Sequence, residues 1–321
     1  MKEQNKRIFI LNLFFSLCLV VLYDPFNAYP KEYSKAPAWL TQSQIDSIDQ
    51  IKVKWEDETD EYSFILKKEK SFWTYSEKEN SEPLFCDQDK VILFLTALSG
   101  WKRFERDSKI LKDEEFLKEG SPGRLSLLGE GKIILDWEWG KCYRNQTDCL
   151  VRAKGASLSF QIPAFLPNHL GFSTDDFFLS DRPFFHISPK SINFVEYSLG
   201  GQIRFGIRKE KETWVLESEE KNKLNNSSVD SFLLRIVSWG GESGFLKKHL
   251  SPEFLSGKEI QKLKVGYLDE ENQQEYIEAV DMGIFKGNYK LLRVEPRIQY
   301  IIMPSYSWEY FRFFDTKQLQ N

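Results

Sequence analysis

A phrase of seven residues occurs twice in this chain, and this repetition limits the folds that are open to it. Residues 67–73 return as residues 208–214, a shift of 141 positions: both stretches begin with two basic residues, an acidic one and a basic one, and both end in tryptophan. The same shift relates three flanking pairs, which are Ile51 and Ile192, Phe64 and Phe205, and Leu66 and Ile207. Two tandem copies of one structural unit are therefore expected.

A second repeated phrase has helical periodicity. Apolar residues at i, i+3, i+4, i+7 and i+10 lie on one side of an α-helix, so each copy of the phrase predicts one helix that faces a core. The residues are Val91, Phe94, Leu95, Leu98 and Trp101 in the first copy, and Val229, Phe232, Leu233, Ile236 and Trp239 in the second. Asp89 and Ser227 precede these helices as candidate N-caps, and Gly100 and Gly240 are placed to end them.

Alternating apolar residues on both sides of each helix predict strands. Leu125 and Leu127 correspond to Leu263 and Val265 in the second copy, and 150–152 corresponds to 291–293. Each copy thus reads as a strand meander, one helix and a second strand meander, which favours an α+β fold over a doubly wound sheet. The predicted organisation is an N-terminal membrane segment (1–28), a tether (29–45), copy one (46–175), a connector (176–188) and copy two (189–321).

Several features that occur in only one copy could be functional, but each also has a structural explanation. Trp137 and Trp139 alternate with acidic residues and could form a ligand platform, but Val280 and Met282 in the second copy favour a core role. The acidic run 56–61 could hold a cation, but it falls at a turn that copy two makes at 199–201, which favours a solvated hairpin tip. The aromatic-rich residues 306–314 complete a core or form a docking surface.

The first residues indicate export. Basic residues precede an uncharged, mostly apolar run from Ile8 to Tyr23, which at about 1.5 Å per residue falls short of a bilayer core about 30 Å thick. A membrane anchor and a cleaved signal peptide both remain open, and the absence of well-placed small residues after the run favours the anchor. The basic flank then predicts a single pass through the inner membrane with the main domain on the extracytoplasmic side.

The net charge bears on the class of partner, and the cysteines bear on the compartment. The net charge of −4, with acids and bases interspersed, does not favour nucleic acid as a partner. Cys142 and Cys149 bracket a polar loop, where a disulfide in an oxidising compartment would close a hairpin mouth; two unpaired thiols are the alternative. Cys86 has no obvious partner. The spacing of the cysteines and histidines predicts no metal site.

The sequence has no recognisable catalytic pattern. His169, His186 and His249 are widely separated and lack a metal-protease spacing, and the chain has no Walker loop or dinucleotide fingerprint. Residues 241–244 only superficially resemble a nucleophile elbow. An arginine recurs at the same place in the two copies, as Arg152 and as Arg293. These residues either pack their stems on a strand face or form a shared ligand clamp. We therefore expect neither enzymatic activity nor a cofactor.

Taken together, these motifs resemble domain-of-unknown-function family 4340, a group of bacterial envelope proteins. The resemblance is carried by Ile51, Val53, Trp73, Val91, Phe94, Leu95, Leu98, 179–182, Trp214, Val229, Phe232 and Leu233. It implies a non-catalytic accessory or scaffolding subunit that works beside a gliding-motility-type ABC transporter, with the permease as a partner. The alternative hypothesis is a ligand-binding or sensing module that uses the cleft between the two copies.

Overall fold

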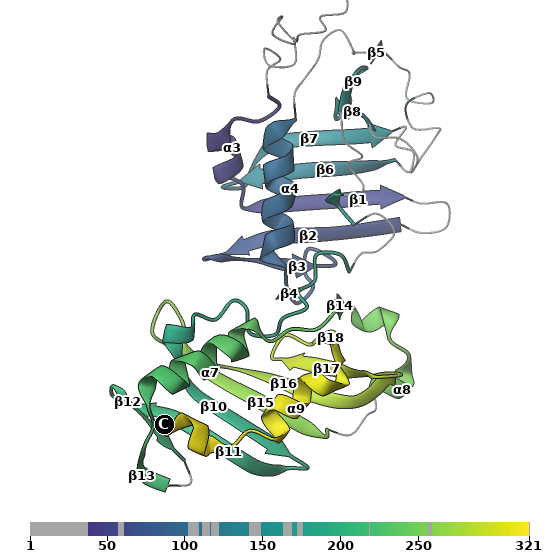
Figure 1. Cartoon of the computed structure of the whole chain (residues 1–321). Helices are drawn as coiled ribbons and strands as arrows, with labels where there is room; N and C mark the ends of the chain where they lie inside the picture. Colours follow the sequence, from purple (N-terminus) through teal and green to yellow (C-terminus); the bar gives the residue numbers. More distant parts are fainter. Residues whose placement is uncertain are drawn as a thin grey trace, which may run out of the picture.

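The computed structural model describes residues 38–56, 61–101, 109–110, 116, 122–140, 149–162, 169–171, 176–217, 219–255 and 259–320. These residues form two large antiparallel sheets with few helices (Figure 1). Such an architecture is compatible with the expected α+β class, although strands predominate. The predicted segment 8–23 lies outside the described residues. Within them, no helix is both long and apolar enough to cross a membrane.

The first sheet has nine strands among the described residues, in the order β4-β3-β2-β1-β6-β7-β8-β9-β5. Their bounds are β1 Gln50–Glu56, β2 Glu61–Glu69, β3 Phe72–Ser76, β4 Leu84–Phe85, β5 Lys109–Ile110, β6 Gly123–Gly129, β7 Lys132–Gly140, β8 Cys149–Ala153 and β9 Leu158–Ile162. The helix α4 (Gln88–Gly100) lies across one face of this sheet (Figure 1).

The second sheet, also nine-stranded in the described part of the chain, has the order β13-β12-β11-β10-β15-β16-β17-β18-β14. Its strands are β10 Ile192–Leu199, β11 Gln202–Glu210, β12 Thr213–Leu216, β13 Glu219–Lys223, β14 Ser243–Phe245, β15 Gln261–Leu268, β16 Gln274–Lys286, β17 Tyr289–Glu295 and β18 Gln299–Pro304. Counted from the first strand of each, the two orders are the same. Residues that hold the same place in the two ladders are called counterparts below.

The ladders correct two of the expected correspondences. Val53 pairs with Phe64, whereas Tyr197 pairs with Phe205, so the counterpart of Ile51 is Val195 rather than Ile192. The cause is hairpin length: the second hairpin closes through Gly200 and Gly201, which both have positive φ angles and form a tighter connection.

The second correction concerns the two tryptophans of β7. Leu125 pairs with Trp137 and its counterpart Leu263 pairs with Ala279, so the counterparts of Trp137 and Trp139 are Ala279 and Asp281. Val280 and Met282 point to the other face. Both tryptophans are only 1% exposed, which confirms their core role.

The two large helices begin earlier than expected. The N-caps of α4 and α7 (Asn226–Ser238) are Asp87 and Asn225, whose side-chain oxygens accept hydrogen bonds from the first free backbone N–H groups of each helix. Asp89 and Ser227 are already helical. Gly100 is the last residue of α4, and Trp101 and Trp239 end the helices in extended conformation, so neither helix needs a left-handed glycine.

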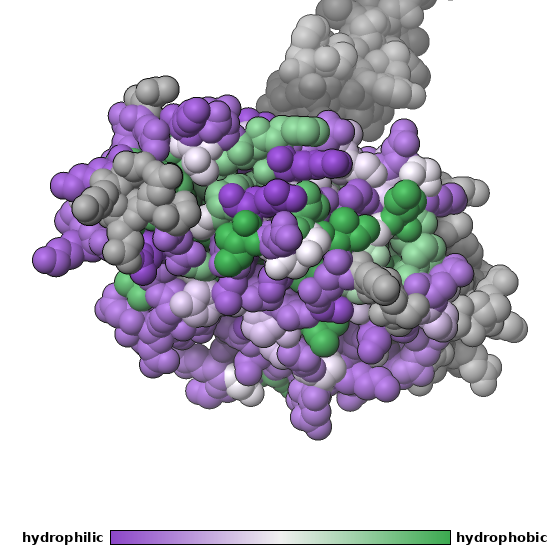
Figure 2. Space-filling view, turned by 90° about the horizontal axis from the view of Figure 1, so that it is seen from below, coloured by the Kyte–Doolittle hydropathy of each residue, from purple (hydrophilic) through white to green (hydrophobic). Residues whose placement is uncertain are grey.

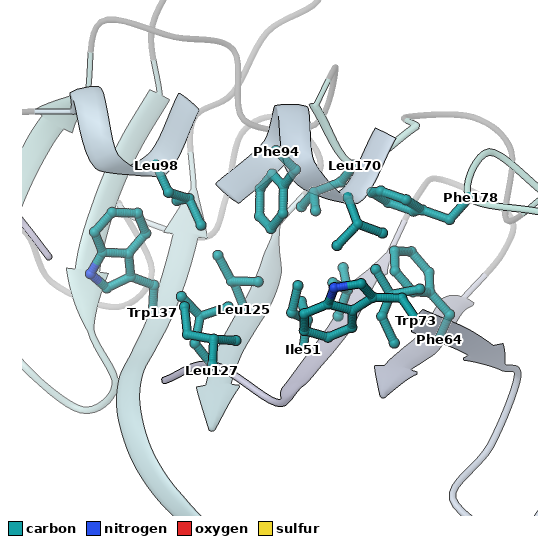
Figure 3. Close-up of a cluster of buried hydrophobic side chains, with 14 of the residues drawn as sticks. Ile51, Phe64, Trp73, Phe94, Leu98, Leu125, Leu127, Trp137, Leu170 and Phe178 are labelled. Carbon is teal, nitrogen blue, oxygen red and sulfur yellow. The ribbon is translucent and has the colours of Figure 1, made fainter. Parts of the chain in front are cut away.

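Each helix buries its repeated apolar stripe against its sheet. Phe94 and Leu98 of α4 point down onto Ile51, Leu125, Leu127 and Trp137 of the first sheet, and Phe178 closes the same cluster beside Phe64 (Figure 3). Val229, Phe232, Leu233 and Ile236 of α7 do the same over the second sheet. The helical periodicity seen in the sequence is therefore the periodicity of core contact.

Both ends of the described chain pack onto a core. α3 (Gln42–Asp46) belongs to the expected tether, yet Leu40 is buried in the first core and Trp39 lies edge-on against Trp137 at 4.6 Å between ring centroids. At the C-terminus, η4 (Ser305–Trp308) and α9 (Glu309–Arg312) place Trp308 and Phe311 in the second core. Tyr306 and Phe313 remain exposed.

The remaining short elements cover the second sheet. η2 (Pro189–Ser191) leads into β10, and η5 (Thr316–Leu319) contacts α7. η3 (Lys247–His249) and α8 (Pro252–Leu255) follow β14. Near α8, a separate apolar cluster forms on the sheet face opposite α7, from Leu250, Val280, Met282, Leu291 and Tyr300.

The two sheets meet along a seam made by residues 178–182. On one side, Ser180 N–H donates to Phe85 O and Asp87 N–H donates to Phe178 O. On the other side, Gly241 N–H donates to Asp181 O, while Gln299 bridges both sheets by accepting from Phe85 N–H and donating to Ser180 O, each at 2.7 Å. The apolar connector thus packs between the sheets, as its sequence predicts.

Candidate functional site

A cavity of about 280 Å³ lies at the seam, where the start of α4 meets the connector and β14. It is called the seam pocket here. Its lining consists of Lys90, Asp176, Phe177, Leu179, Asp181, Glu242, Ser243, Gly244 and Phe245. The volume is near the lower limit of small-molecule sites. The pocket therefore suits a small polar ligand better than a large one.

Lys90 supplies the positive charge of the seam pocket. It lies in the first turn of α4, and its ammonium group donates to Phe177 O at 2.7 Å. The same nitrogen lies 3.6 Å from the Asp87 carboxylate and 4.8 Å from the centre of the Phe177 ring. A lysine held by a carbonyl, a carboxylate and an aromatic face has a fixed position, because each contact restricts its flexible stem.

Asp176 joins the pocket to the residues that follow β14. Its Oδ1 accepts a hydrogen bond from Leu246 N–H at 3.0 Å, and its Oδ2 contacts His249 Nδ1. A carboxylate that holds one imidazole nitrogen is the orienting part of many acid–base sites. Catalysis would also require a nucleophile within hydrogen-bond reach of His249. Ser243 shares the pocket lining with Asp176 but begins β14, so it does not form a strand-to-helix elbow.

The other two carboxylates of the pocket have different environments. Burial raises the pKa of Asp181, and the neighbouring Arg182 guanidinium, 3.7 Å away, acts in the opposite direction. Glu242 accepts a hydrogen bond from the Tyr289 hydroxyl at 2.8 Å. With three carboxylates and one lysine, the lining has a net negative charge, which favours a cationic or amine-bearing ligand.

The three histidines have separate environments. His169 packs edge-on against Trp101, and burial lowers its pKa. His186 stacks on Phe85 at 4.4 Å between ring centroids, and burial together with Arg297 lowers its pKa to about 3. His249 pairs with Asp176. In the described part of the chain, no group of three or more His, Cys, Asp or Glu side chains is placed to hold a metal ion.

Two of the four cysteines, Cys86 and Cys149, lie among the described residues. Cys149 is buried in β8 and is disulfide-bonded, whereas Cys86 is a buried free thiol. Cys142 lies outside the described residues, so its pairing with Cys149 stays a prediction. Burial raises the pKa of Cys86 well above its ordinary value, which makes this thiol unreactive.

The recurring arginines are counterparts on the outer faces of the two sheets. Arg152 lies 3.0 Å from Glu138 and 4.2 Å from the centre of the Phe116 ring. Arg293 lies 3.0 Å from Glu259 and 2.7 Å from Glu295. Each arginine pairs with a glutamate of its own sheet, Glu138 in β7 or Glu295 in β17, which supports the strand-face interpretation over a shared ligand clamp.

Sequence reasoning missed the seam pocket and the Asp176–His249 pair. Asp176 and His249 are 73 positions apart, and no spacing rule connects a connector residue with a residue beyond an edge strand. The only available signal was the apolar character of the connector, which predicts packing but names no partner.

No protein-family model, curated protein or solved structure matches this chain significantly. The resemblance to family 4340 therefore stays a prediction.

Proposed function

We propose that this chain is a non-catalytic, membrane-anchored envelope protein that serves as an accessory or scaffolding subunit of an ABC-type transport system. Residues 8–23 would hold it in the inner membrane, with the two sheets on the extracytoplasmic side. The disulfide at Cys149 supports an oxidising compartment, since cytosolic proteins rarely keep such bonds. The family resemblance supplies the transporter as the partner.

The scaffold itself would be two tandem copies of one α+β unit. The shared strand order supports this, as do the equivalent places of α4 and α7 and the counterpart arginines Arg152 and Arg293.

The observation that carries the scaffolding proposal is the way in which the two sheets share their cores. Phe85 of the first sheet is buried in the core of the second, and Leu246, which follows β14 of the second sheet, is buried in the core of the first. Gln299 and the ion pair of Arg297 with Glu69, at 2.9 Å, connect the sheets again. Shared burial of this kind fixes one sheet relative to the other, as a spacer between two partners requires.

The outer face of α4 offers a surface for such a partner. Ile92 and Leu93 are 56% and 67% exposed, whereas their counterparts in α7 are the polar residues Asp230 and Ser231. By contrast, the surface seen from below in Figure 2 is largely hydrophilic, with hydrophobic residues in separate places. α4 therefore exposes an adjacent pair of aliphatic side chains, whereas α7 exposes only Leu234, and this difference favours a protein contact at α4.

Co-purification tests the proposal. The tagged full-length chain is extracted in mild detergent, and we expect an ABC permease and its ATPase to co-purify. The matched variant carries Ile92→Asp and Leu93→Ser, the residues of α7, and should lose these subunits while remaining folded. Recovery of the wild-type chain without any transporter subunit in several mild detergents would contradict the proposal.

A second candidate function is ligand binding or sensing in the seam pocket. The observation that favours it is a fixed lysine among three carboxylates in a cavity between the two sheets. Ligand binding there would couple the sheets through the connector.

A thermal-shift screen with small amines, amino acids and polyamines tests this alternative. A hit should raise the melting temperature of the wild-type chain and lose its effect in Asp181→Asn. A screen without hits, together with unchanged transporter co-purification in Asp181→Asn, would remove the ligand-binding hypothesis.

A further inference from the structure

A carboxylate and a lysine meet inside the second sheet, at a place that the proposed function does not use. Asp281 of β16 is completely buried, and the side chain of Lys290 in β17 is 18% exposed. The Lys290 ammonium group is in direct hydrogen-bond contact with Asp281 Oδ2. Buried ion pairs are uncommon, because removing both charges from water is costly.

The surrounding backbone holds this carboxylate in one orientation. β16 bulges after Asp281, and Gly283 takes a φ of 109°, which a side chain would disfavour. The bulge turns Gly283 N–H onto Asp281 Oδ1 at 2.8 Å. Gln261 Nε2 donates to Oδ2 at 2.7 Å, and Gln261 Oε1 in turn accepts from the Tyr197 hydroxyl at 2.7 Å. Both carboxylate oxygens are therefore bound by fixed donors.

We propose that Lys290 and Asp281 condense to an intramolecular amide that covalently joins β16 and β17. In the buried pair, the ammonium group transfers one proton to Oδ2, which gives a neutral amine and a neutral acid. The amine nitrogen then attacks Cγ of Asp281, and a C–N bond forms. A second proton moves from nitrogen to the departing Oδ2, the C–O bond breaks, and one water leaves. No oxidant, reductant or other co-reactant takes part.

The observed donors match the charges that this step develops. Negative charge grows on Oδ1 as the nitrogen attacks, and Gly283 N–H already points at that oxygen, as a donor of an oxyanion hole does. Gln261 keeps Oδ2 on the side of Lys290, where it can accept the proton and depart. The partial exposure of the lysine provides a path for the water. The product amide is uncharged, so burial favours it over the ion pair.

The first sheet has a covalent bond at the matching place. The counterpart of Lys290 is Cys149, which is disulfide-bonded. Both sheets would then carry a cross-link at the same end of the same strand, made by different chemistry.

Peptide mass spectrometry of the purified full-length chain decides the matter. Trypsin cannot cleave after an amidated lysine, so we expect a branched peptide that joins residues 265–286 to residues 287–293 and is one water lighter than the two together. Recovery of the linear peptide 287–290 as the main product would overturn the proposal.

Two variants control the experiment. Lys290→Arg keeps the positive charge but cannot form this amide, and it should restore cleavage after position 290. Lys262→Arg changes a lysine whose ammonium group lies 3.2 Å from Glu278 at the partly exposed sheet surface, and it should leave the branched peptide unchanged. If the branched peptide persists in Lys290→Arg, Lys290 is not the linked residue and the proposal fails.

Discussion

The two sheets have one strand order but fill the same core position with opposite chemistry. In the first sheet, Trp139 lies over Gly123, and a Cβ on that glycine would stand 2.1 Å from the indole ring. In the second sheet, the counterparts are Asp281 and Gln261, which hydrogen-bond to each other at 2.7 Å. One site is closed by a large ring over a glycine, and the other by a polar network.

The difference shows what the ladder requires and what it leaves open. Backbone hydrogen bonds fix the strand order and the registers, and they are indifferent to side-chain chemistry. The site needs only that its volume is filled and that its polar groups are satisfied. A tryptophan over a glycine fills this volume in the first sheet, and an aspartate with Gln261, Tyr197 and Lys290 fills it in the second with a hydrogen-bonded network.

The largest effect is expected when an aspartate, as found at this position in the second sheet, replaces the tryptophan of the first sheet. Trp139→Asp would leave a large cavity and bury a carboxylate opposite Gly123, which has no side chain to donate a hydrogen bond. Losing the packed ring alone costs about 3–5 kcal/mol, and the unpaired charge adds to it. Since domains are stable by about 5–15 kcal/mol, we expect this variant to lose its folded structure in circular dichroism.

Trp139→Phe is the control for this variant, because it retains an apolar ring at the same position. We expect cooperative urea unfolding with a loss well below that of Trp139→Asp. If the free energy of unfolding of Trp139→Asp lies within about 2 kcal/mol of the wild-type value, the first sheet tolerates a polar side chain at this position and the contrast between the two sites fails.

The next largest effect compares Gln299, which bridges the two sheets at the seam, with its counterpart in the first sheet. Gln299→Ala leaves Phe85 N–H and Ser180 O without their buried partner, and each such group costs about 1–3 kcal/mol. The counterpart of Gln299 is Leu158, which is 39% exposed. Urea unfolding should therefore show a loss of about 2–4 kcal/mol for Gln299→Ala and a clearly smaller one for Leu158→Ala. Equal losses would show that the seam adds no special stability.

Much of this comparison could be predicted from the sequence. The helical spacing from Val91 to Trp101 identified the correct core-facing stripe, because burial on a helix has a fixed period. The strand meanders were also correct, since alternation of apolar residues is a local property. A constant shift between the repeated phrases was less reliable: the tight turn at Gly200 and Gly201 moved the registers of the ladders, so Ile51 was matched with the wrong residue.

The rest depended on contacts that no local pattern encodes. No local pattern distinguishes Asp281 from the other acidic residues, because its partners Gln261 and Lys290 come from neighbouring strands. The seam pocket likewise joins a helix start, a connector and an edge strand. Such sites are set by the docking of the sheets, and only a three-dimensional structure brings their residues together.

The stability of the protein should also depend on pH through His186, which packs between Phe85 of the first sheet and Tyr267 of the second. The folded pKa of His186 is about 3, below its ordinary 6.5, so below about pH 6.5 the unfolded chain binds a proton that the folded chain does not. The stability is complete above that pH and is lost as the pH falls toward the folded pKa, by up to about 1.4 kcal/mol per pH unit.

His186→Phe should flatten this dependence while keeping the stacking on Phe85. The free energy of unfolding is measured by urea titration at about pH 7 and about pH 5 for both proteins. The wild type should lose more stability between these two conditions than the variant does. Parallel pH profiles would mean that His186 is not the group that makes the folded state sensitive to acid.

The smallest effect on stability is expected from exchanging the outer faces of the two large helices. Ile92→Asp with Leu93→Ser, and separately Asp230→Ile with Ser231→Leu, change exposed positions where mainly helix propensity acts, so each pair should alter the free energy of unfolding by less than about 1 kcal/mol. Transporter co-purification should respond only to the change in α4, since α7 has no exposed aliphatic pair to lose. A loss above about 2 kcal/mol in the α4 variant would mean that Ile92 and Leu93 stabilise the fold itself. The two helices would then differ in internal packing, and the contact surface proposed for α4 would have no support.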